Sequence, residues 1–194
     1  MSKDKLIWEK LASRRGPDLP LFGVRFDKLR HPQTSAEFER LVLEAPAWVN
    51  VVAVTEAGEI VMVEQFRFGV GKLTLEPVGG IVDAGEDSLA AARRELLEES
   101  GYGGGSWHYL GCVQANPAYH DNLCHHWLAD GVTRVQDPAP DEGEAIRVHL
   151  LSLEALRQAV ASGWLCHSLG LSALSRVFSL WELPYTPPAA ADTL

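Results

Sequence analysis

Residues 93–100 read Arg-Arg-Glu-Leu-Leu-Glu-Glu-Ser, and the interpretation of the whole fold starts from them. In a helix, Glu95 lies beside Glu98 at i+3 and Glu99 at i+4, so the three carboxylates share one face. Like charges at that spacing repel each other, and the negative end of the helix dipole adds a penalty of roughly 0.3–1 kcal/mol. The stretch therefore predicts a helix whose acidic face needs a compensating positive charge.

The flanking residues predict where this helix begins and ends. Asp87 or Ser88 can cap its N-terminus, and Gly101 is suited to its C-terminal cap. An apolar stripe at i, i+3 and i+7 is formed by Leu89, Ala92 and Leu96. We expect this stripe to pack against the domain, roughly opposite the glutamates, which would then face outward.

Composition limits the classes of protein that this chain can belong to. It has 194 residues, 46% hydrophobic and 22% charged, which suits one ordinary globular domain. No apolar run approaches the ~20 residues needed to cross a bilayer, and residues 1–16 contain no segment resembling a signal peptide. The three cysteines form no disulfide framework. We therefore predict a cytoplasmic protein.

The formal net charge of −9 restricts the partners. It argues against binding to nucleic acid or to an anionic membrane surface. An anionic substrate would need metal cations to hold it on so acidic a protein.

Segments on both sides of the acidic helix have strand-like composition. The strands expected before it are 21–30, 38–44, 48–55, 60–66 and 72–78, and those after it are 107–114, 123–129 and 145–152. Two closing helices are expected at 153–163 and 168–182. Residues 103–105, three glycines, are expected to be a flexible turn, and 184–194 a disordered tail. The pattern indicates a mixed α/β domain with one functional helix in its middle.

Extending outward from the glutamates gives a longer pattern, G-x5-E-x7-R-E-U-x-E-E-x-G-U, which runs from Gly80 to Tyr102. It resembles the Nudix box, with every fixed letter in place. The resemblance implies the Nudix fold, an α/β (α+β) class α/β/α sandwich around a mixed β-sheet. It implies a hydrolase domain over 47–183, preceded by an N-terminal β extension over 1–46. It also implies hydrolysis of a nucleoside diphosphate linked to a further moiety.

The physical chemistry of the helix supports a metal site. Carboxylates at i, i+3 and i+4, here Glu95, Glu98 and Glu99, are hard oxygen ligands suited to Mg²⁺, with Mn²⁺ as the alternative. Arg94 lies four residues before Glu98 and can orient it, so both are candidate catalytic residues. The resemblance adds the Gly79 carbonyl as a backbone ligand. A solvated acidic face is the other explanation, but the register of the flanking motif residues argues against it.

Two further segments narrow the substrate. VEQFR (63–67) and LEPVGG (75–80) resemble the arrangement in ADP-ribose and nucleoside diphosphate sugar pyrophosphatases. By that resemblance Arg67 contacts substrate phosphate and Glu76 lines the same site, although a solvated strand end would also explain Arg67. Pro117, fifteen residues after Tyr102, resembles the proline that marks the ADP-ribose subgroup, but an ordinary loop proline remains open.

The general base is expected outside the helix. The segment 141–152, DEGEAIRVHLLS, resembles the loop that carries this base in the ADP-ribose subgroup. The match makes Glu142 the candidate base and Glu144 a candidate additional metal ligand. Which of the two is the base stays open, and an ordinary acidic surface loop is the alternative. A zinc site at residues 124–126 is disfavoured, because adjacent strand residues point to opposite faces.

These observations predict metal-dependent hydrolysis of ADP-ribose, or of a related nucleoside diphosphate sugar, to a nucleoside monophosphate and a sugar phosphate. The alternatives are a Nudix hydrolase of another dinucleotide or nucleotide sugar, such as NADH, diadenosine polyphosphate or GDP-mannose, and a non-catalytic nucleotide sensor. The intact motif argues against the sensor. The resemblance also implies a homodimer to which the N-terminal extension contributes.

Overall fold

The computed structural model describes residues 6–181, so the tail expected at 184–194 lies outside the described part. The chain divides into two compact units. The first comprises the residues up to Ala47 together with Cys112–Cys124, and the second comprises Trp48–Gly111 and the residues from His125 onward. No helix among residues 6–181 is long and apolar enough to cross a membrane.

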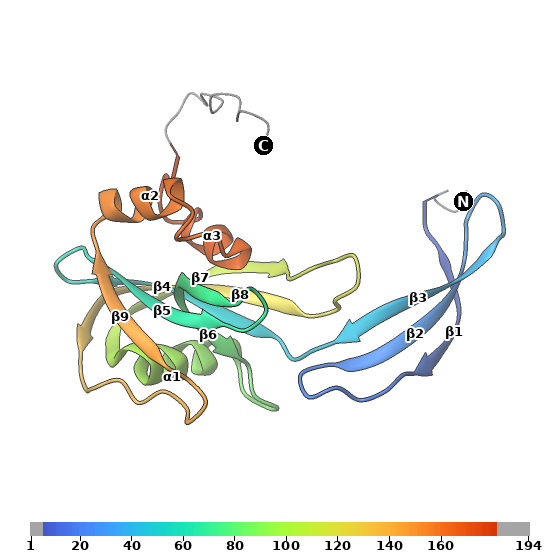
Figure 1. Ribbon diagram of the computed structural model, residues 1–194, viewed down its shortest axis with the longest axis horizontal. Coiled ribbons are helices and arrows are strands. Elements are labelled where there is room, and N and C mark those ends of the chain that lie inside the picture. The colour runs from blue at the N-terminus through green and yellow to red at the C-terminus, as the bar shows by residue number, and fades with distance from the viewer. Residues whose placement is uncertain (1–5, 182–194) are drawn as a thin grey trace. The chain divides into compact units, whose positions relative to one another are not determined.

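The first unit is built on a three-stranded antiparallel sheet in the order β1-β2-β3 (Figure 1). Its strands are β1 (Glu9–Arg15), β2 (Gly23–Arg30) and β3 (Glu37–Glu44). The strands expected at 21–30 and 38–44 are thus confirmed, whereas β1 was not anticipated. It is a mostly exposed edge strand and so lacks the hydrophobic alternation that marks a half-buried one. An ion pair from Lys10 and a hydrogen bond donated by Ser13, both to the buried Asp27 of β2, help to hold it.

The second unit contains the larger sheet, in the order β7-β8-β4-β6-β5-β9. Its strands are β4 (Trp48–Thr55), β5 (Ile60–Arg67), β6 (Lys72–Ile81), β7 (Tyr102–Gln114), β8 (Leu123–Arg134) and β9 (Ile146–Leu151). All six expected strands are present. The turn between β4 and β5 uses Gly58 at φ 79°, and the Thr55 N–H donates to the Glu59 carbonyl at 2.8 Å.

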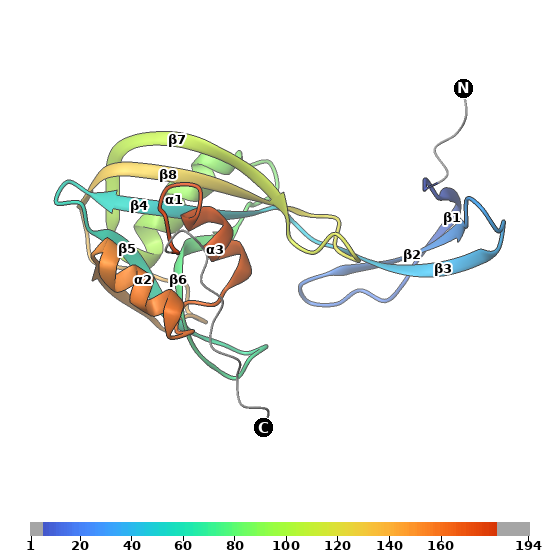
Figure 2. The same ribbon diagram turned by 90° about the horizontal axis from the view of Figure 1, so that it is seen from above.

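Helices cover both faces of this sheet, as Figures 1 and 2 show. Helix α1 (Ser88–Ser100) lies on one face, and α2 (Leu153–Ala161) and α3 (Ser168–Leu174) lie on the other. Each interface has its own apolar core. The α1 side is packed by residues that include Val51, Val63, Val78, Ala92 and Leu96. The α2 and α3 side is packed by residues that include Met62, Leu75, Leu156, Leu165 and Leu174. The predicted α/β/α sandwich is confirmed.

The last helix is shorter than predicted. The pattern indicated a helix over 168–182, but α3 ends at Leu174 and irregular turns follow as far as Trp181. The amides of Arg176 and Val177 donate to carbonyls three residues back, a tighter turn than that of an α-helix. The Ser175 hydroxyl donates to the Ser172 carbonyl, a competing local bond of the kind that weakens helices.

The expected flexible turn at 103–105 is also wrong, because these glycines lie inside β7. Gly104 and Gly105 have φ values of 74° and 68°, which allow an irregularity within the strand. At Gly105 the backbone passes so close to the Asp130 carbonyl that a Cβ atom would overlap it. Glycine is therefore required here by close packing.

Helix α1 begins and ends where the sequence indicated. The Asp87 carboxylate, rather than Ser88, caps the N-terminus by accepting from the amides of Leu89 and Ala90 at 2.9 and 3.1 Å. Gly101 closes the C-terminus at φ 75°. The expected outward orientation is wrong for Glu99, which is only 2% exposed, whereas the side chain of Glu98 is 40% exposed.

Two glycines of β6 allow close approach of the neighbouring elements. A Cβ atom at Gly80 would overlap the carboxylate of Glu95. A Cβ atom at Gly79 would overlap the backbone carbonyl of Val49 and the side chain of Asn50. Gly80 thus leaves room for a carboxylate of α1, and Gly79 allows β6 to lie close to β4.

Gly79→Ala is expected to destabilise the protein by about 1–3 kcal/mol, because the added methyl group meets rigid backbone. Urea unfolding of the variant and the wild type would measure the difference. Gly69→Ala is the matched control, since a Cβ atom there meets nothing within 4 Å. Equal stability of the two variants would contradict the close approach at Gly79.

Candidate active site

The guanidinium of Arg94 is the centre of the acidic helix surface. Its Nε and Nη2 donate to the two carboxylate oxygens of Glu86 at 3.1 and 3.0 Å, and Nη2 also donates to the Ile81 carbonyl at 3.0 Å. Its Nη1 donates to Glu95 at 2.8 Å and to Glu98 at 3.2 Å. These bonds raise the pKa of Arg94 and lower that of Glu86, in each case chiefly through the hydrogen bonds between the two. The sequence had indicated only the Glu98 contact.

Glu95 and Glu99 are the most deeply placed carboxylates of the motif. Burial raises the pKa of Glu99 to about 8, although the Gly79 N–H, which donates to it at 3.1 Å, acts in the opposite direction. The charges of Glu95 and Glu144 raise it further. Burial also raises the pKa of Glu95, against the influence of Arg94. Without a cation, the site therefore favours a proton on Glu99 over its ionised form.

A divalent cation suits this donor set chemically. Glu95, Glu98, Glu99 and Glu144 supply hard oxygen atoms, and a cation would offset the cost of burying the ionised form of Glu99. Within residues 6–181, however, no three acidic, histidine or cysteine side chains converge on one metal position. Arg94 engages two of the carboxylates and the Gly79 amide engages a third. Ion binding would require these side chains to turn from their present partners.

A second charged cluster lies on β5 and β6, as the segments 63–67 and 75–80 had indicated. Arg67 donates from Nε and Nη2 to the two carboxylate oxygens of Glu76 at 2.9 and 2.8 Å. The side chain of Glu76 is 2% exposed, while that of Arg67 is 46% exposed. Burial would raise the pKa of Glu76, but the hydrogen bonds, chiefly those from Arg67, lower it overall.

Sequence reasoning missed two partners of Glu76. The Thr74 hydroxyl donates to Oε1 at 2.6 Å, and Nδ1 of His167 lies 3.0 Å from Oε2. Thr74 alternates with Glu76 along one strand and could have been found from that spacing. His167 precedes α3 and carries no local pattern that would have singled it out.

The loop candidates differ in their surroundings. Both Glu142 and Glu144 are exposed, but the charge of Glu144 acts on Arg67, Glu95 and Glu99. The loop is tied to the end of α1, because the Ala139 amide donates to the Glu98 carbonyl at 2.8 Å. The structure thus brings Glu144 into electrostatic range of the acidic cluster and leaves Glu142 in the adjoining turn.

Two further features singled out in the sequence are Pro117 and the histidine-containing segment 124–126. Pro117 is exposed in a turn of the first unit, and its role in substrate binding stays a prediction. In β8, Cys124 and His126 are buried, whereas His125 contacts the Tyr109 hydroxyl at 2.9 Å. Burial raises the pKa of Cys124 to about 12 and lowers that of His126 to about 4.

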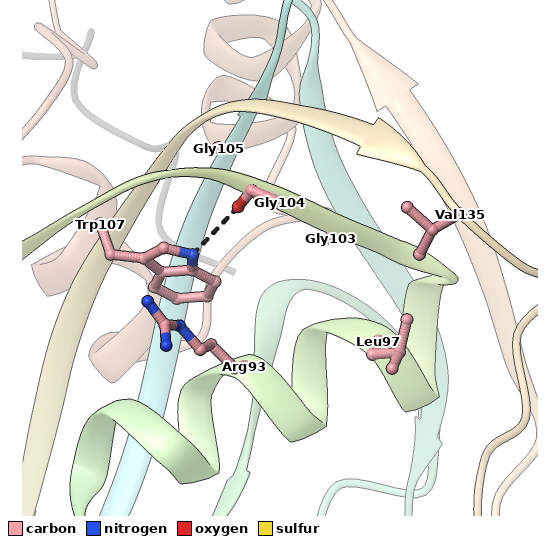
Figure 3. A pocket seen from close by; sticks show the side chains of 7 residues that line it. All are labelled: Arg93, Leu97, Gly103, Gly104, Gly105, Trp107 and Val135. Atoms are coloured by element: carbon pink, nitrogen blue, oxygen red, sulfur yellow. Dashed lines mark hydrogen bonds between the residues drawn. The ribbon is translucent and has the colours of Figure 1, made fainter.

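A hollow of about 300 Å³ lies between α1 and β7 (Figure 3). It is lined by Arg93, Leu97, Gly103, Gly104, Gly105, Trp107 and Val135. The Arg93 guanidinium lies 5.6 Å from the centre of the Trp107 ring system, and the indole N–H donates to the Gly104 carbonyl at 3.0 Å. Arg93 and Leu97 lie on the side of α1 opposite the glutamates. The hollow is therefore separate from the acidic cluster.

Comparison with known proteins agrees with this geometry. Residues 45–165 match the family model of the NUDIX domain. The chain is 33% identical over 134 residues to the methanol dehydrogenase activator of Bacillus methanolicus, an alignment that covers 69% of this chain and 71% of that protein. It is 31% identical over 125 residues to the ADP-ribose pyrophosphatase of Bacillus subtilis (strain 168), covering 64% and 68% of the two chains.

The fold also matches a solved structure described as an ADP compounds hydrolase. The TM-score is 0.78 at 20% identity, over 91% of this chain and 95% of the other. With the family match and the intact motif, the conclusion is direct: the chain belongs to the Nudix family of hydrolases.

In the metal-free protein, stability is expected to fall as the pH rises from about 4.5 to about 8. The folded state keeps a proton on Glu99 that the unfolded state has already released, so a higher pH favours unfolding. Glu99→Gln should remove this dependence and stabilise the protein at pH 9, on the order of 1–3 kcal/mol. Thermal unfolding in EDTA between pH 5 and pH 9 would measure it.

The exposed Glu56 supplies the matched control, as Glu56→Gln should leave the pH profile of stability unchanged. Added Mg²⁺ should raise the Tm of the wild type more at pH 9 than at pH 6. Parallel profiles for the wild type and Glu99→Gln would show that Glu99 does not carry the buried charge.

Proposed function

We propose that the protein hydrolyses the pyrophosphate bond of ADP-ribose, or of a related nucleoside diphosphate sugar, with Mg²⁺ (or Mn²⁺) as the cofactor. The products would be a nucleoside monophosphate and a sugar phosphate. The observation that carries the proposal is that the second unit contains both an acidic cluster and an accessible arginine. The carboxylates of α1 can bind cations, and the half-exposed guanidinium of Arg67 can bind a phosphate oxygen.

The geometry of Arg67 supports this role. Its bonds to Glu76 use Nε and Nη2, so Nη1 has no protein hydrogen-bond partner among residues 6–181. A guanidinium held in this way presents its remaining N–H groups in a fixed plane, which suits a phosphate group. The charge of Arg67 also acts on the buried carboxylate of Glu99. The resemblance to an ADP-ribose pyrophosphatase points to the same substrate class.

The cation ligands proposed are the Gly79 carbonyl and the carboxylates of Glu95, Glu98, Glu99 and Glu144. A bound divalent cation would polarise the pyrophosphate and lower the pKa of an attacking water molecule. Arg94 holds Glu95 and Glu98 in position through its Nη1 group. Glu142 is proposed as the general base that accepts the proton of the water, because a loop carboxylate can move toward bound substrate.

The test is Mg²⁺-dependent hydrolysis of a panel of substrates by the purified protein. We expect ADP-ribose to be cleaved faster than ADP-glucose, GDP-mannose, NADH and diadenosine polyphosphate, with AMP and ribose 5-phosphate as products separated by chromatography. Faster cleavage of another member would change the substrate and leave the chemistry in place. Binding of nucleotides without turnover of any member would contradict the enzyme proposal.

Variants in the same assay separate the proposed roles. Glu142→Gln should lower kcat about 10²–10⁴-fold with little change in Mg²⁺ affinity, as expected for loss of a general base. Glu99→Gln and Glu144→Gln should instead weaken Mg²⁺ binding. Asp137→Asn, an exposed neighbour in the same loop region, is the control with unchanged activity. A large kcat loss for Glu144→Gln, with Glu142→Gln active, would exchange the two assignments.

We propose further that the active form is a homodimer to which the first unit contributes, and that Pro117 lies against the substrate. Partly exposed apolar side chains on both faces of β3, Phe38 on one and Leu41 on the other, leave apolar surface on this unit for a partner to cover. Sedimentation velocity is expected to give a mass twice the 21.3 kDa of one chain. A monomer at micromolar concentration would contradict the dimer and leave the hydrolase proposal untouched.

A further inference from the structure

The segment that leads into α3 covers the edge of β6 beside the Arg67–Glu76 pair. The Leu75 amide donates to the Trp164 carbonyl at 3.4 Å. Further along, Gly170 approaches Pro77 so closely that a Cβ atom would lie 2.7 Å from its Cδ. Two contacts, one on each side of Glu76, therefore fix the segment against the strand.

His167 lies between these two contacts and reaches Glu76 itself. Its Nδ1 is buried and lies 3.0 Å from Oε2 of Glu76, an ion-pair contact without the alignment of a hydrogen bond, and it has no hydrogen-bond partner among residues 6–181. Three successive residues of β6 therefore each contact the segment, in the pairs Leu75–Trp164, Glu76–His167 and Pro77–Gly170. The position of the imidazole follows from backbone packing on both sides of it.

The contacts of Glu76 divide between its two oxygen atoms. Oε1 receives the Thr74 hydroxyl and Nε of Arg67, while Oε2 faces Nη2 of Arg67 and Nδ1 of His167. Without the imidazole, the remaining contact of Oε2 would be Nη2 of Arg67. The carboxylate could then turn together with the guanidinium that it is meant to orient. A carboxylate can rotate about its last bond, and such terminal torsions have broad energy wells. A second partner on each oxygen restricts this rotation and so fixes the plane of the guanidinium more firmly.

We propose that His167 is a positioning residue of the site: it fixes the Glu76 carboxylate and, through it, turns the free edge of the Arg67 guanidinium toward a substrate phosphate group. The inference rests on the proposed function, in which Arg67 receives that phosphate. Among the residues of the site, the side chain of His167 makes its ion-pair contact with Glu76. Its effect should therefore fall on substrate binding, with little effect on the metal or on the general base.

The kinetic test uses the full-length protein with Mg²⁺ and the fastest substrate of the panel. His167→Ala should raise KM about tenfold with a smaller change in kcat, because a guanidinium that is free to turn binds phosphate less well. His167→Asn should restore most of the loss, since its amide nitrogen can occupy roughly the place of Nδ1. His167→Gln, whose amide extends further, should not. The exposed His108 supplies the control, His108→Ala, with unchanged KM.

A second measurement needs no substrate. In ¹⁵N–¹H spectra, the Nε–H signal of Arg67, assigned by its loss in Arg67→Lys, should be protected from exchange with water in the wild type. It should broaden or disappear in His167→Ala and return in His167→Asn. This measurement reports on the positioning contact even if no member of the panel is hydrolysed, so failure of the proposed function and failure of this inference are distinguishable.

Three results would overturn the inference. The first is an unchanged KM and an unchanged Arg67 signal in folded His167→Ala. The second is a lowered Tm alone, which would make His167 only a packing residue of α3. The third is an equal loss in the Ala, Asn and Gln variants, which would assign the effect to the volume of the ring. If His167→Ala does not fold, the comparison of Asn with Gln decides.

Discussion

The structure of the acidic site depends on one guanidinium, that of Arg94, whose five N–H groups all have protein acceptors. They join the turn before α1 through Glu86, the end of β6 through the Ile81 carbonyl, and α1 itself through Glu95 and Glu98. A lysine could not replace this arrangement, because a point charge on a flexible stem offers no planar fork. The same bonds that dock the helix also place its carboxylates.

Arg94 compensates the glutamates unequally, and the inequality indicates where added positive charge is needed. Glu95 and Glu98 share its Nη1 group, while Glu99 is held by the Gly79 amide. A backbone amide offsets part of the burial cost but brings no net charge, so the pKa of Glu99 is raised to about 8. On β5 and β6 the charges are balanced differently. There the buried carboxylate of Glu76 is paired with Arg67, and this arginine keeps N–H donors available for an anion.

Sequence patterns predicted those features that depend on residues close together in the chain, such as strand bounds and helix caps. The strand at 48–55 was found with its bounds because a valine-rich run is buried on both faces. The cap residue Gly101 was found because a left-handed residue must end the helix. The same reasoning wrongly predicted a turn at 103–105, because glycines serve a strand irregularity and close backbone packing as well as a turn. It also predicted too long a last helix, because it did not foresee that the Ser175 hydroxyl bonds to the backbone.

By itself, the sequence determined that Glu95, Glu98 and Glu99 share one helix face and that Arg94 can reach Glu98, because helical periodicity relates residues three and four apart. It also determined the Nudix family through the spacing of the motif. Only the tertiary structure decided that this face turns toward β6, where Gly80 leaves space for the Glu95 carboxylate. The tertiary structure likewise brought His167 to Glu76. Contacts between elements depend on the order of strands and on which edge a later segment covers, and no local period encodes either.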